Sequence, residues 1–293
     1  MNKIFTNRQT AVVLLLSLLL IVPSSLSAEA VEDIPDEERT AIEQTAMDYG
    51  DGFYSGAPER MARAIHPDLN KVFIRFLPQT KKSFVSYSSY SILVEATRAE
   101  MGLTPPEKRK ITVEALLMNG DVACAKFMSA QYNDFLQMVK IDGQWKIVNV
   151  LWFPGPDSRG RILPEGFDQD KERESAVKTA LDYIQGAQSG DVARLESALH
   201  PEACRAVYQK IPKTGGVIIQ RNRFSGLVEP VRAGMGVVPE DKRQAETRVI
   251  DMMDAMAFLE VSTHNAFHYI QMQWMEGRWK IFNILVLPKP GTP

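Results

Sequence analysis

Four histidines are the first residues of this sequence that could do chemistry. His66 and His200 each stand directly before a proline, and either could act as a general base because imidazole titrates near neutral pH. Both also lie where a helix is expected to end, and an imidazole at such a place commonly bonds backbone groups. We therefore expect a structural role for this pair and keep general-base catalysis as the alternative.

His264 and His268 are four residues apart, a spacing that would put two metal ligands on one face of a helix. The segment reads His-Asn-Ala-Phe-His, so it lacks the glutamate of a zinc-protease helix, and no third ligand stands out. Serine nucleophile elbows, phosphate-binding loops and dinucleotide fingerprints are also absent from the sequence. We therefore expect neither a metal nor a cofactor, and we expect binding rather than catalysis.

The sequence contains an internal repeat, and the repeated unit must hold any functional site in place. Residues 134–152 read DFLQMVKIDGQWKIVNVLW, and residues 268–286 read HYIQMQWMEGRWKIFNILV, so the two copies start 134 residues apart. The same offset relates several other segments, with one residue of slippage expected near Asp121 and Asp254. This spacing suits a small domain of ~100–150 residues, so the chain is two copies of one domain.

The N-terminus has the pattern of a secretory signal peptide over residues 1–30. Lys3 and Arg8 form a positive head, an apolar run follows over residues 11–22, and Ala28-Glu29-Ala30 offers a cleavage site. Cleavage after Ala28 would also fit, and an uncleaved membrane anchor is the alternative. The apolar run is shorter than the ~20 residues that span a bilayer, so we expect an exported protein, periplasmic or secreted, without a membrane span after cleavage.

Charge and cysteine content narrow the choice of partners and compartment. Loss of residues 1–30 changes the formal charge from −2 to −3, and a mildly acidic chain without basic clusters argues against a nucleic-acid surface. Cys124 and Cys204 lie at positions that do not match between the two copies. A disulfide would be allowed in an oxidising compartment, but we expect two buried free thiols.

Helices come first and strands follow in each copy, which predicts an α+β fold class with an antiparallel meander. Ile42, Ala46, Tyr49 and Phe53 recur at three- and four-residue spacing, as in an amphipathic helix. The first copy is expected to have helices over about 39–55, 58–65 and 86–101, then strands over about 69–77, 110–118, 122–132, 135–141 and 144–153. The predicted boundaries are 39–153 for the first domain, 154–171 for a Gly- and Pro-rich linker, and 172–288 for the second domain.

The residues resemble a known superfamily of folds. The helix ending in Ser55-Gly56, the His66-Pro67 pair and above all the terminal hairpin VKIDGQWKIVNVLW are similar to the nuclear transport factor 2-like superfamily. The resemblance is to the branch labelled putative lumazine-binding, close to the SnoaL-type cyclases. It implies two tandem cone-shaped domains, each with N-terminal helices packed in a curved antiparallel sheet that leaves a pocket.

The resemblance also implies a test for catalysis, because the superfamily includes ketosteroid isomerases. In those enzymes a tyrosine on the first helix stabilises an oxyanion and a carboxylate on the first strand removes a proton. Tyr49 and Tyr183 match the tyrosine position, but the base position falls on Phe73 and Val207. Isomerase chemistry of that kind is therefore not expected, and each tyrosine is either a ligand-binding residue or a core tyrosine with a satisfied hydroxyl.

Both faces of the last strand are apolar, so we expect both to be covered. In the first copy one face is expected to carry Trp145, Ile147, Asn149 and Leu151, and the other Val148, Val150 and Trp152. Superfamily members often dimerise through their sheets. We therefore expect the two copies to pack sheet to sheet as an intramolecular pseudo-dimer.

Polar side chains among these apolar residues are the remaining candidates for a ligand site. Asn149 and Asn283 would line the cones if they face inward, and Gln137 and Gln271 belong to the same group. The copies also differ, and Tyr87 in the first is replaced by Arg221 in the second, so an anionic ligand would suit the second cone better.

Together these patterns predict an exported protein that binds an unknown small molecule in one or both cones. The first alternative is an isomerase, dehydratase or cyclase of the ketosteroid-isomerase or SnoaL type. The second is a protein-interaction module whose cones are filled by their own side chains. Pocket volume separates this last alternative from the other two.

Overall fold

The computed structural model describes residues 33–77, 79–80, 82–158, 161–163 and 166–291. The predicted signal peptide lies outside these residues. Those described belong to one compact unit, Glu32–Pro293. Among them, no helix combines the length and the hydrophobicity that a membrane crossing requires.

Each copy of the repeat folds into helices and six strands, one strand more than the sequence predicts. The first copy contains α1 (Asp36–Tyr54), α2 (Pro58–Ala64), β1 (Ile65–Leu77), β2 (Lys82–Ser88), α3 (Tyr90–Arg98), α4 (Pro106–Arg109), β3 (Thr112–Asn119), β4 (Val122–Met128), β5 (Tyr132–Ile141) and β6 (Gln144–Pro154). The second contains α5 (Gln169–Ser189), α6 (Val192–Ala198), β7 (Leu199–Lys210), β8 (Val217–Arg223), α7 (Phe224–Arg232), the 3-10 helix η1 (Glu240–Lys242), β9 (Ala245–Met253), β10 (Met256–Thr263), β11 (Ala266–Met275) and β12 (Arg278–Pro288).

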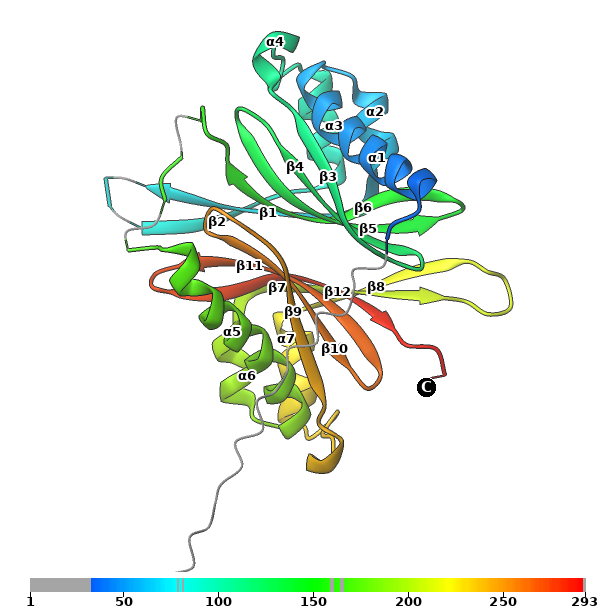
Figure 1. The fold of residues 1–293 in the computed structure, drawn as a ribbon, viewed down its shortest axis with the longest axis vertical. Helices are drawn as coiled ribbons and strands as arrows, with labels where there is room; N and C mark the ends of the chain where they lie inside the picture. The colour runs from blue at the N-terminus through cyan, green and yellow to red at the C-terminus, as the bar shows by residue number, and fades with distance from the viewer. Residues whose placement is uncertain (1–32, 78, 81, 159–160, 164–165, 292–293) are drawn as a thin grey trace, which may run out of the picture. The chain divides into compact units, whose positions relative to one another are not determined.

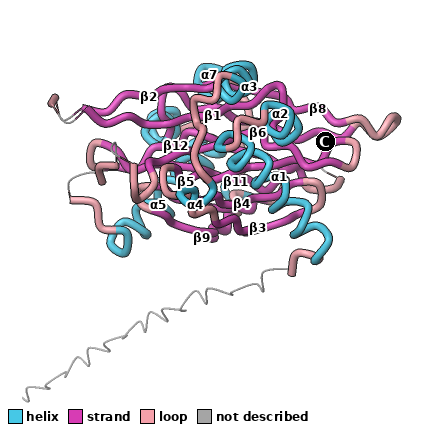
Figure 2. The backbone as a smooth tube through the Cα atoms, turned by 90° about the horizontal axis from the view of Figure 1, so that it is seen from above, coloured by secondary structure: helices cyan, strands magenta, loops and turns pink. Residues whose placement is uncertain are grey.

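Two six-stranded sheets result, with strand orders β2-β1-β6-β5-β4-β3 and β8-β7-β12-β11-β10-β9. The sheets are mixed rather than wholly antiparallel, because β1 pairs with β6, and β7 with β12, in parallel. Helices α1 to α3 cover one face of the first sheet, and α5 to α7 cover one face of the second (Figure 1). The β1–β2 and β7–β8 hairpins extend in opposite directions (Figures 1 and 2). The fold is thus α+β, with two cone-shaped units in tandem.

Helix α1 forms where the apolar spacing predicts it. Ile42, Ala46 and Tyr49 are buried against the sheet, on one face of the helix. Its first turn holds Asp36, Glu37 and Glu38, whose negative charges favour the positive end of the helix dipole. The chain leaves the helix after Tyr54 and turns at a glycine, Gly56, with φ of 64°.

The third helix of the first copy is shorter than predicted, because the sequence predicts a helix over 86–101 and α3 spans Tyr90–Arg98. Residues 86–88 of the predicted helix belong to strand β2, which pairs with β1 in antiparallel fashion from Leu77–Lys82 to Lys71–Ser88. The segment Phe84-Val-Ser-Tyr87 is rich in side chains that favour strands. Helix α3 starts only at Tyr90, where the Ser89 side chain accepts a hydrogen bond from the Ile92 amide at 3.3 Å.

The prediction of a one-residue shift between the repeats near Asp121 and Asp254 is wrong. Strands β3 and β9 end at Asn119 and Met253, and β4 and β10 start at Val122 and Met256, so the offset stays at 134 residues across both turns. In these turns Gly120 and Asp254 occupy equivalent places, with φ of 56° and 54°. Aspartate tolerates this left-handed conformation better than most residues, which is why a non-glycine residue can stand here.

The predicted alternation along the last strand is also interrupted. Met138 pairs with Ile147 and Gln137 pairs with Asn149, so Val148 is an extra residue in a β-bulge. The bulge reverses the facing of all later side chains. Trp145 and Ile147 therefore pack in the first cone, whereas Asn149 and Leu151 face the second sheet.

The faces opposite the helices of the two sheets contact each other within the compact unit. Phe135 and Phe258 pack with ring centroids 5.4 Å apart, and one continuous apolar cluster contains residues of both copies. Lys126 pairs with Asp251 at 2.8 Å beside this apolar contact. Cys124 and Cys204 are both buried free thiols, as expected.

Candidate functional site

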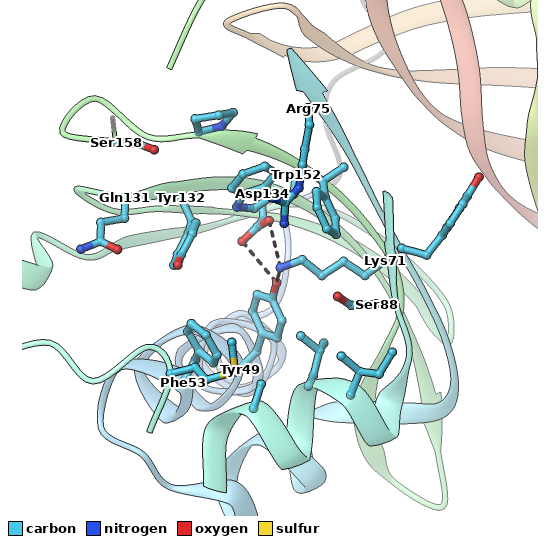
Figure 3. Close-up of a pocket in the computed structure, with 18 of the residues that line it drawn as sticks. Tyr49, Phe53, Lys71, Arg75, Ser88, Gln131, Tyr132, Asp134, Trp152 and Ser158 are labelled. Carbon is cyan, nitrogen blue, oxygen red and sulfur yellow. Dashed lines mark hydrogen bonds and ion pairs between the residues drawn. The ribbon is translucent and has the colours of Figure 1, made fainter. Parts of the chain in front are cut away.

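A cavity of about 750 Å³ opens in the first cone, between α1, α3 and the concave face of the first sheet. Tyr49 from α1, Lys71 from β1 and Asp134 from β5 converge in it (Figure 3). A volume of this size is typical of small-molecule sites. The first cone is therefore not filled by its own side chains.

The three polar groups contact one another inside the cavity (Figure 3). The Tyr49 hydroxyl donates a hydrogen bond to Asp134 Oδ2 at 3.3 Å, and Lys71 Nζ donates to the same hydroxyl. Lys71 Nζ lies 3.8 Å from Asp134 Oδ1, a distance that allows ionic attraction but is too long for a hydrogen bond. Asp134 Oδ1 is buried and accepts no hydrogen bond from any residue that the structure describes.

Strand pairing explains why Lys71 and Asp134 meet. Strands β1 and β5 lie on either side of β6, where Lys71 pairs with Val150 and Asp134 pairs with Trp152. Val150 and Trp152 are two residues apart and so share one face of β6. The two charged side chains therefore project diagonally toward each other from the flanking strands. Tyr49 reaches them from helix α1, which covers this face of the sheet.

Burial shifts the pKa of each group in this trio. Burial raises the pKa of Asp134 to about 6, although the Lys71 ammonium and the Tyr49 hydroxyl both oppose that rise. Burial lowers the pKa of Lys71, against the attraction of Asp134, and raises the pKa of Tyr49, with Asp134 adding to that rise. A perturbed trio of this kind in a cavity marks a candidate functional site.

Aromatic side chains form much of the cavity wall. They are Phe53, Phe73, Phe84, Phe127, Tyr132 and Trp152, in addition to Tyr49 and Tyr87. Flat rings pack on one another with an energetic gain beyond simple burial, so such a wall favours a planar ligand. Toward the mouth, Phe84, Ile92 and Met101 leave 43%, 56% and 77% of their surface exposed, so the rim is apolar as well.

Two of the residues predicted to bind a ligand lie at this cavity. Tyr49 is part of the polar trio, and Tyr87 lines the wall with 37% of its surface exposed. The alternative that Tyr49 is a core tyrosine with a satisfied hydroxyl holds in part, because its hydroxyl bonds to Lys71 and Asp134. Lys71 and Asp134, the two partners of this hydroxyl, both line the cavity.

The predicted residues Gln137, Asn149 and Arg221 lie between the two sheets, outside the cavity. Gln137 Nε2 donates to the Tyr269 carbonyl of the second copy at 2.7 Å, and Asn149 Nδ2 donates to Gln137 Oε1 at 2.7 Å. Arg221 donates to Asn149 Oδ1 at 2.9 Å and to the Val148 carbonyl at 2.8 Å. The Arg221 guanidinium therefore links the second sheet to the first by hydrogen bonds.

Gln271 and Asn283 make the corresponding contacts from the second copy. Gln271 Nε2 donates to the Phe135 carbonyl at 2.9 Å, and Asn283 Nδ2 donates to Gln271 Oε1 at 2.9 Å. Asn70 takes the place of Arg221 and donates to Asn283 Oδ1 at 2.7 Å. The bulge in each last strand turns Asn149 and Asn283 away from the cones, toward the same side as their pairing partners Gln137 and Gln271.

The second cone carries a different trio at the equivalent positions. Adding the 134-residue offset to Tyr49, Lys71 and Asp134 gives Tyr183, Arg205 and His268. Tyr183 and His268 lie with ring centroids 5.9 Å apart, edge to face. Burial lowers the pKa of His268 to about 3, and the nearby Arg205 charge adds to this, so the imidazole is neutral.

Sequence reasoning missed Lys71 and Asp134. It looked for a base on the first strand, found Phe73, and concluded that the base was absent, whereas the structure brings a carboxylate to Tyr49 from β5. The available signal was charge in otherwise apolar strands, Lys71 in Leu-Asn-Lys-Val-Phe and Asp134 in Asn-Asp-Phe-Leu. A charged side chain in a buried strand is seldom retained without a partner or a function.

The histidines have the structural contacts expected for the first pair. His66 Nδ1 accepts the Asp68 amide at 3.0 Å, and His200 Nδ1 accepts the Glu202 amide at 3.1 Å. His264 is exposed in the turn between β10 and β11, so it does not share a helix face with His268. Among the residues that the structure describes, no three His, Cys, Asp or Glu side chains gather as a metal site would require.

Comparison with known proteins identifies the family. The sequence profile described as putative lumazine-binding matches residues 37–153 and 171–285, which are most of the chain. The chain belongs to this family, in two tandem copies. No relative among the curated proteins matches it.

Solved structures similar to this chain include two that are described as nuclear transport factor 2-like proteins. One, from Shewanella baltica and of unknown function, is 14% identical and covers 43% of this chain and 100% of its own, with a TM-score of 0.33. Another, from Silicibacter pomeroyi, is 14% identical and covers 39% of this chain and 93% of its own, with a TM-score of 0.33. A putative scytalone dehydratase from Novosphingobium aromaticivorans is 16% identical and covers 44% of this chain and 94% of its own, with a TM-score of 0.33.

Proposed function

We propose that the first cone binds a planar, unsaturated small molecule that presents an N–H group beside a C=O group. The observation that carries this proposal is the pair of Lys71 and Asp134 in an aromatic cavity. Lys71 can donate to the ligand carbonyl, and Asp134 Oδ1 can accept from the neighbouring N–H. The family description, putative lumazine-binding, agrees with this chemistry, because lumazine is a flat bicyclic ring with such edges.

The different exposure of Lys71 and Asp134 determines which of the two a ligand contacts first. The Lys71 side chain is 13% exposed and the Asp134 side chain 2%. The ligand carbonyl therefore meets the ammonium first, and the N–H reaches Asp134 as the flexible lysine chain shifts aside. Pairing a buried carboxylate with a second donor offsets part of its desolvation.

Calorimetric titration with three compounds tests this proposal. Lumazine has both the flat bicyclic ring and the N–H and C=O edge, uracil has only the edge, and quinoxaline has only the ring. We expect lumazine to bind most tightly, because it alone contacts both the trio and the aromatic wall. If quinoxaline binds as tightly as lumazine, Tyr49, Lys71 and Asp134 do not contribute to binding. If none of the three compounds shows saturable binding, the proposal is refuted.

The same geometry supports one second candidate, an isomerase or dehydratase activity. A carboxyl group whose pKa is raised to about 6 is well placed as a general base near neutral pH, and Tyr49 and Lys71 could stabilise an oxyanion. A flat bicyclic ketone such as 2-tetralone, incubated in heavy water, should then exchange its α-hydrogens faster than in buffer. An exchange rate equal to that of buffer, or equal in Asp134→Asn, would exclude this activity for the probe.

We also propose that the protein acts outside the cytoplasm and that its two copies function as one intramolecular pseudo-dimer. The first part is supported by the signal-peptide pattern of residues 1–30 and is tested by fractionating cells that express the full chain. The second is supported by the amide contacts of Gln137 and Gln271 across the sheets. Each copy expressed alone should then be insoluble or should self-associate.

A further inference from the structure

We propose that the second cone is a separate binding site for a small aliphatic carboxylate, held by Arg205, His268 and Tyr183. This site is distinct from the one proposed in the first cone. It rests on the exchange of one carboxylate for a neutral imidazole between the two copies.

The exchange leaves a positive charge without a counter-charge. In the first cone Lys71 has Asp134 at 3.8 Å, so the two charges balance. In the second cone Arg205 occupies the lysine position, and no carboxylate of the described residues forms a salt bridge with it. Arg205 Nη2 donates to Asn222 Oδ1 at 3.2 Å, which is a neutral partner. A cation in a cone without an anion is unfavourable unless a ligand supplies one.

Several hydrogen-bonding groups of this trio are unused. Arg205 Nε and His268 Nδ1 are buried and have no partner within the described part of the chain. The Tyr183 hydroxyl and His268 Nε2 make no hydrogen bond with a described residue either, and these two atoms are not shut off from solvent. In the first cone, by contrast, the tyrosine hydroxyl is bonded to both of its neighbours. Arginine, neutral histidine and tyrosine can all donate to one carboxylate.

The surroundings favour an aliphatic carboxylate over a flat heterocycle. The 134-residue offset replaces five aromatic side chains of the first cavity by aliphatic ones, which are Ala187 for Phe53, Val207 for Phe73, Val261 for Phe127, Ala266 for Tyr132 and Val286 for Trp152. These residues belong to the apolar cluster that both copies share, or pack against it. An apolar chain with a single charged end matches such a lining better than phosphate, which has no apolar part.

Hexanoate labelled at its carboxyl carbon is a suitable probe, followed by NMR titration of the full chain. We expect saturable binding to the wild type and much weaker binding of the uncharged hexanamide. Arg205→Met should weaken hexanoate binding by at least about tenfold, because it removes the charged donor. His268→Asp should weaken it as well, since the new carboxylate would itself pair with Arg205.

Lys71→Met is the matched control, because it changes the equivalent position of the first cone. It should leave hexanoate binding unchanged, and near-UV circular dichroism should confirm that each variant is folded. The proposal is overturned if the wild type shows no saturable binding, if Arg205→Met binds as well as the wild type, or if Lys71→Met is the variant that loses binding. The last result would place the carboxylate in the first cone, so failure here is distinguishable from failure of the first-cone proposal.

Discussion

Asp134 on β5 and His268 on β11 occupy the same position in two copies of one fold, yet they create opposite sites. Asp134 accepts a hydrogen bond from Tyr49 and lies beside Lys71. His268 accepts no hydrogen bond from Tyr183, and it lies beside an arginine whose charge disfavours its protonation. One substitution thus separates a charge-balanced cone from a positively charged one. The two copies share their architecture, and we propose that they bind different ligands.

Asp134→Asn should lower the affinity for lumazine by at least about tenfold, the usual effect of losing one hydrogen bond to a charged group. The amide keeps the size of the side chain but has no negative charge, so it cannot balance the ammonium or offer the ligand N–H a charged acceptor. Calorimetry measures the change, with Asp142→Asn in the exposed β5–β6 turn as control. Equal losses in the two variants would point to a general effect rather than to the cavity.

Lumazine affinity should depend on pH through Asp134. Because the pKa of this carboxyl is raised to about 6, it becomes protonated as the pH falls through that value and loses the negative charge that makes it a strong acceptor for the ligand N–H. Affinity should be constant between pH 7 and 8 and should fall below pH 6, approaching about tenfold per pH unit at lower pH. An identical pH profile in Asp134→Asn would contradict this assignment.

Gly50→Ala should destabilise the protein, because the added methyl group would lie 2.0 Å from the ring of Phe127. Phe127 is 1% exposed and cannot move away freely, so overpacking should lower the free energy of unfolding by about 1–3 kcal/mol. Urea unfolding measures this, and a second change, Phe127→Leu, should restore part of the loss. Gly226→Ala in α7, where the methyl group would meet its nearest neighbours at 3.6 Å, should be neutral or slightly stabilising.

Gln137→Met should reduce stability without reducing ligand affinity. The change leaves the Tyr269 carbonyl and the Asn149 amide without their partners between the sheets, which should lower the free energy of unfolding by about 1–3 kcal/mol. Calorimetry with lumazine should give an affinity close to that of the wild type. A large loss of affinity with unchanged stability would instead support the sequence-based prediction that Gln137 binds the ligand.

His268 should make the second cone sensitive to acid. Its pKa is about 3 in the folded protein and 6.5 ordinarily, so between these values the unfolded chain binds a proton that the folded chain does not. The free energy of unfolding should therefore decrease as the pH falls from 6.5 toward 3, and His268→Gln should remove this contribution. Urea unfolding at pH 7 and pH 5 tests it, with the exposed His264→Gln as control. A pH dependence that is the same in His268→Gln and the wild type would contradict the assignment.

Sequence patterns predicted the architecture well because the relevant signals are local or repeated. The spacing of Ile42, Ala46 and Tyr49 predicted α1, and the Asp142-Gly143 turn predicted the hairpin between β5 and β6. The repeat predicted two equivalent domains. Strand β2 was missed because its pairing with β1 is a tertiary contact, which overrides a local pattern that reads as helix.

The site was harder to predict because it depends on contacts between distant residues. Lys71 and Asp134 meet only because β1 pairs with β6 in parallel, a pairing that no hydrophobic pattern reveals. The bulge at Val148 had a similar effect on the opposite face, since one extra residue turned Asn149 from the cone to the interface. Tyr49 was found because a resemblance pointed to it, and its partners became visible only in three dimensions.

The most direct test of the first-cone proposal is a crystal structure of residues 31–293 with lumazine. We predict lumazine between the aromatic walls of the first cavity, with a ring N–H on Asp134 and the adjacent carbonyl oxygen on Lys71 Nζ, each at about 2.7–3.2 Å. Lumazine outside the first cone, or inside it with this edge turned toward the mouth and away from Lys71 and Asp134, would contradict the account.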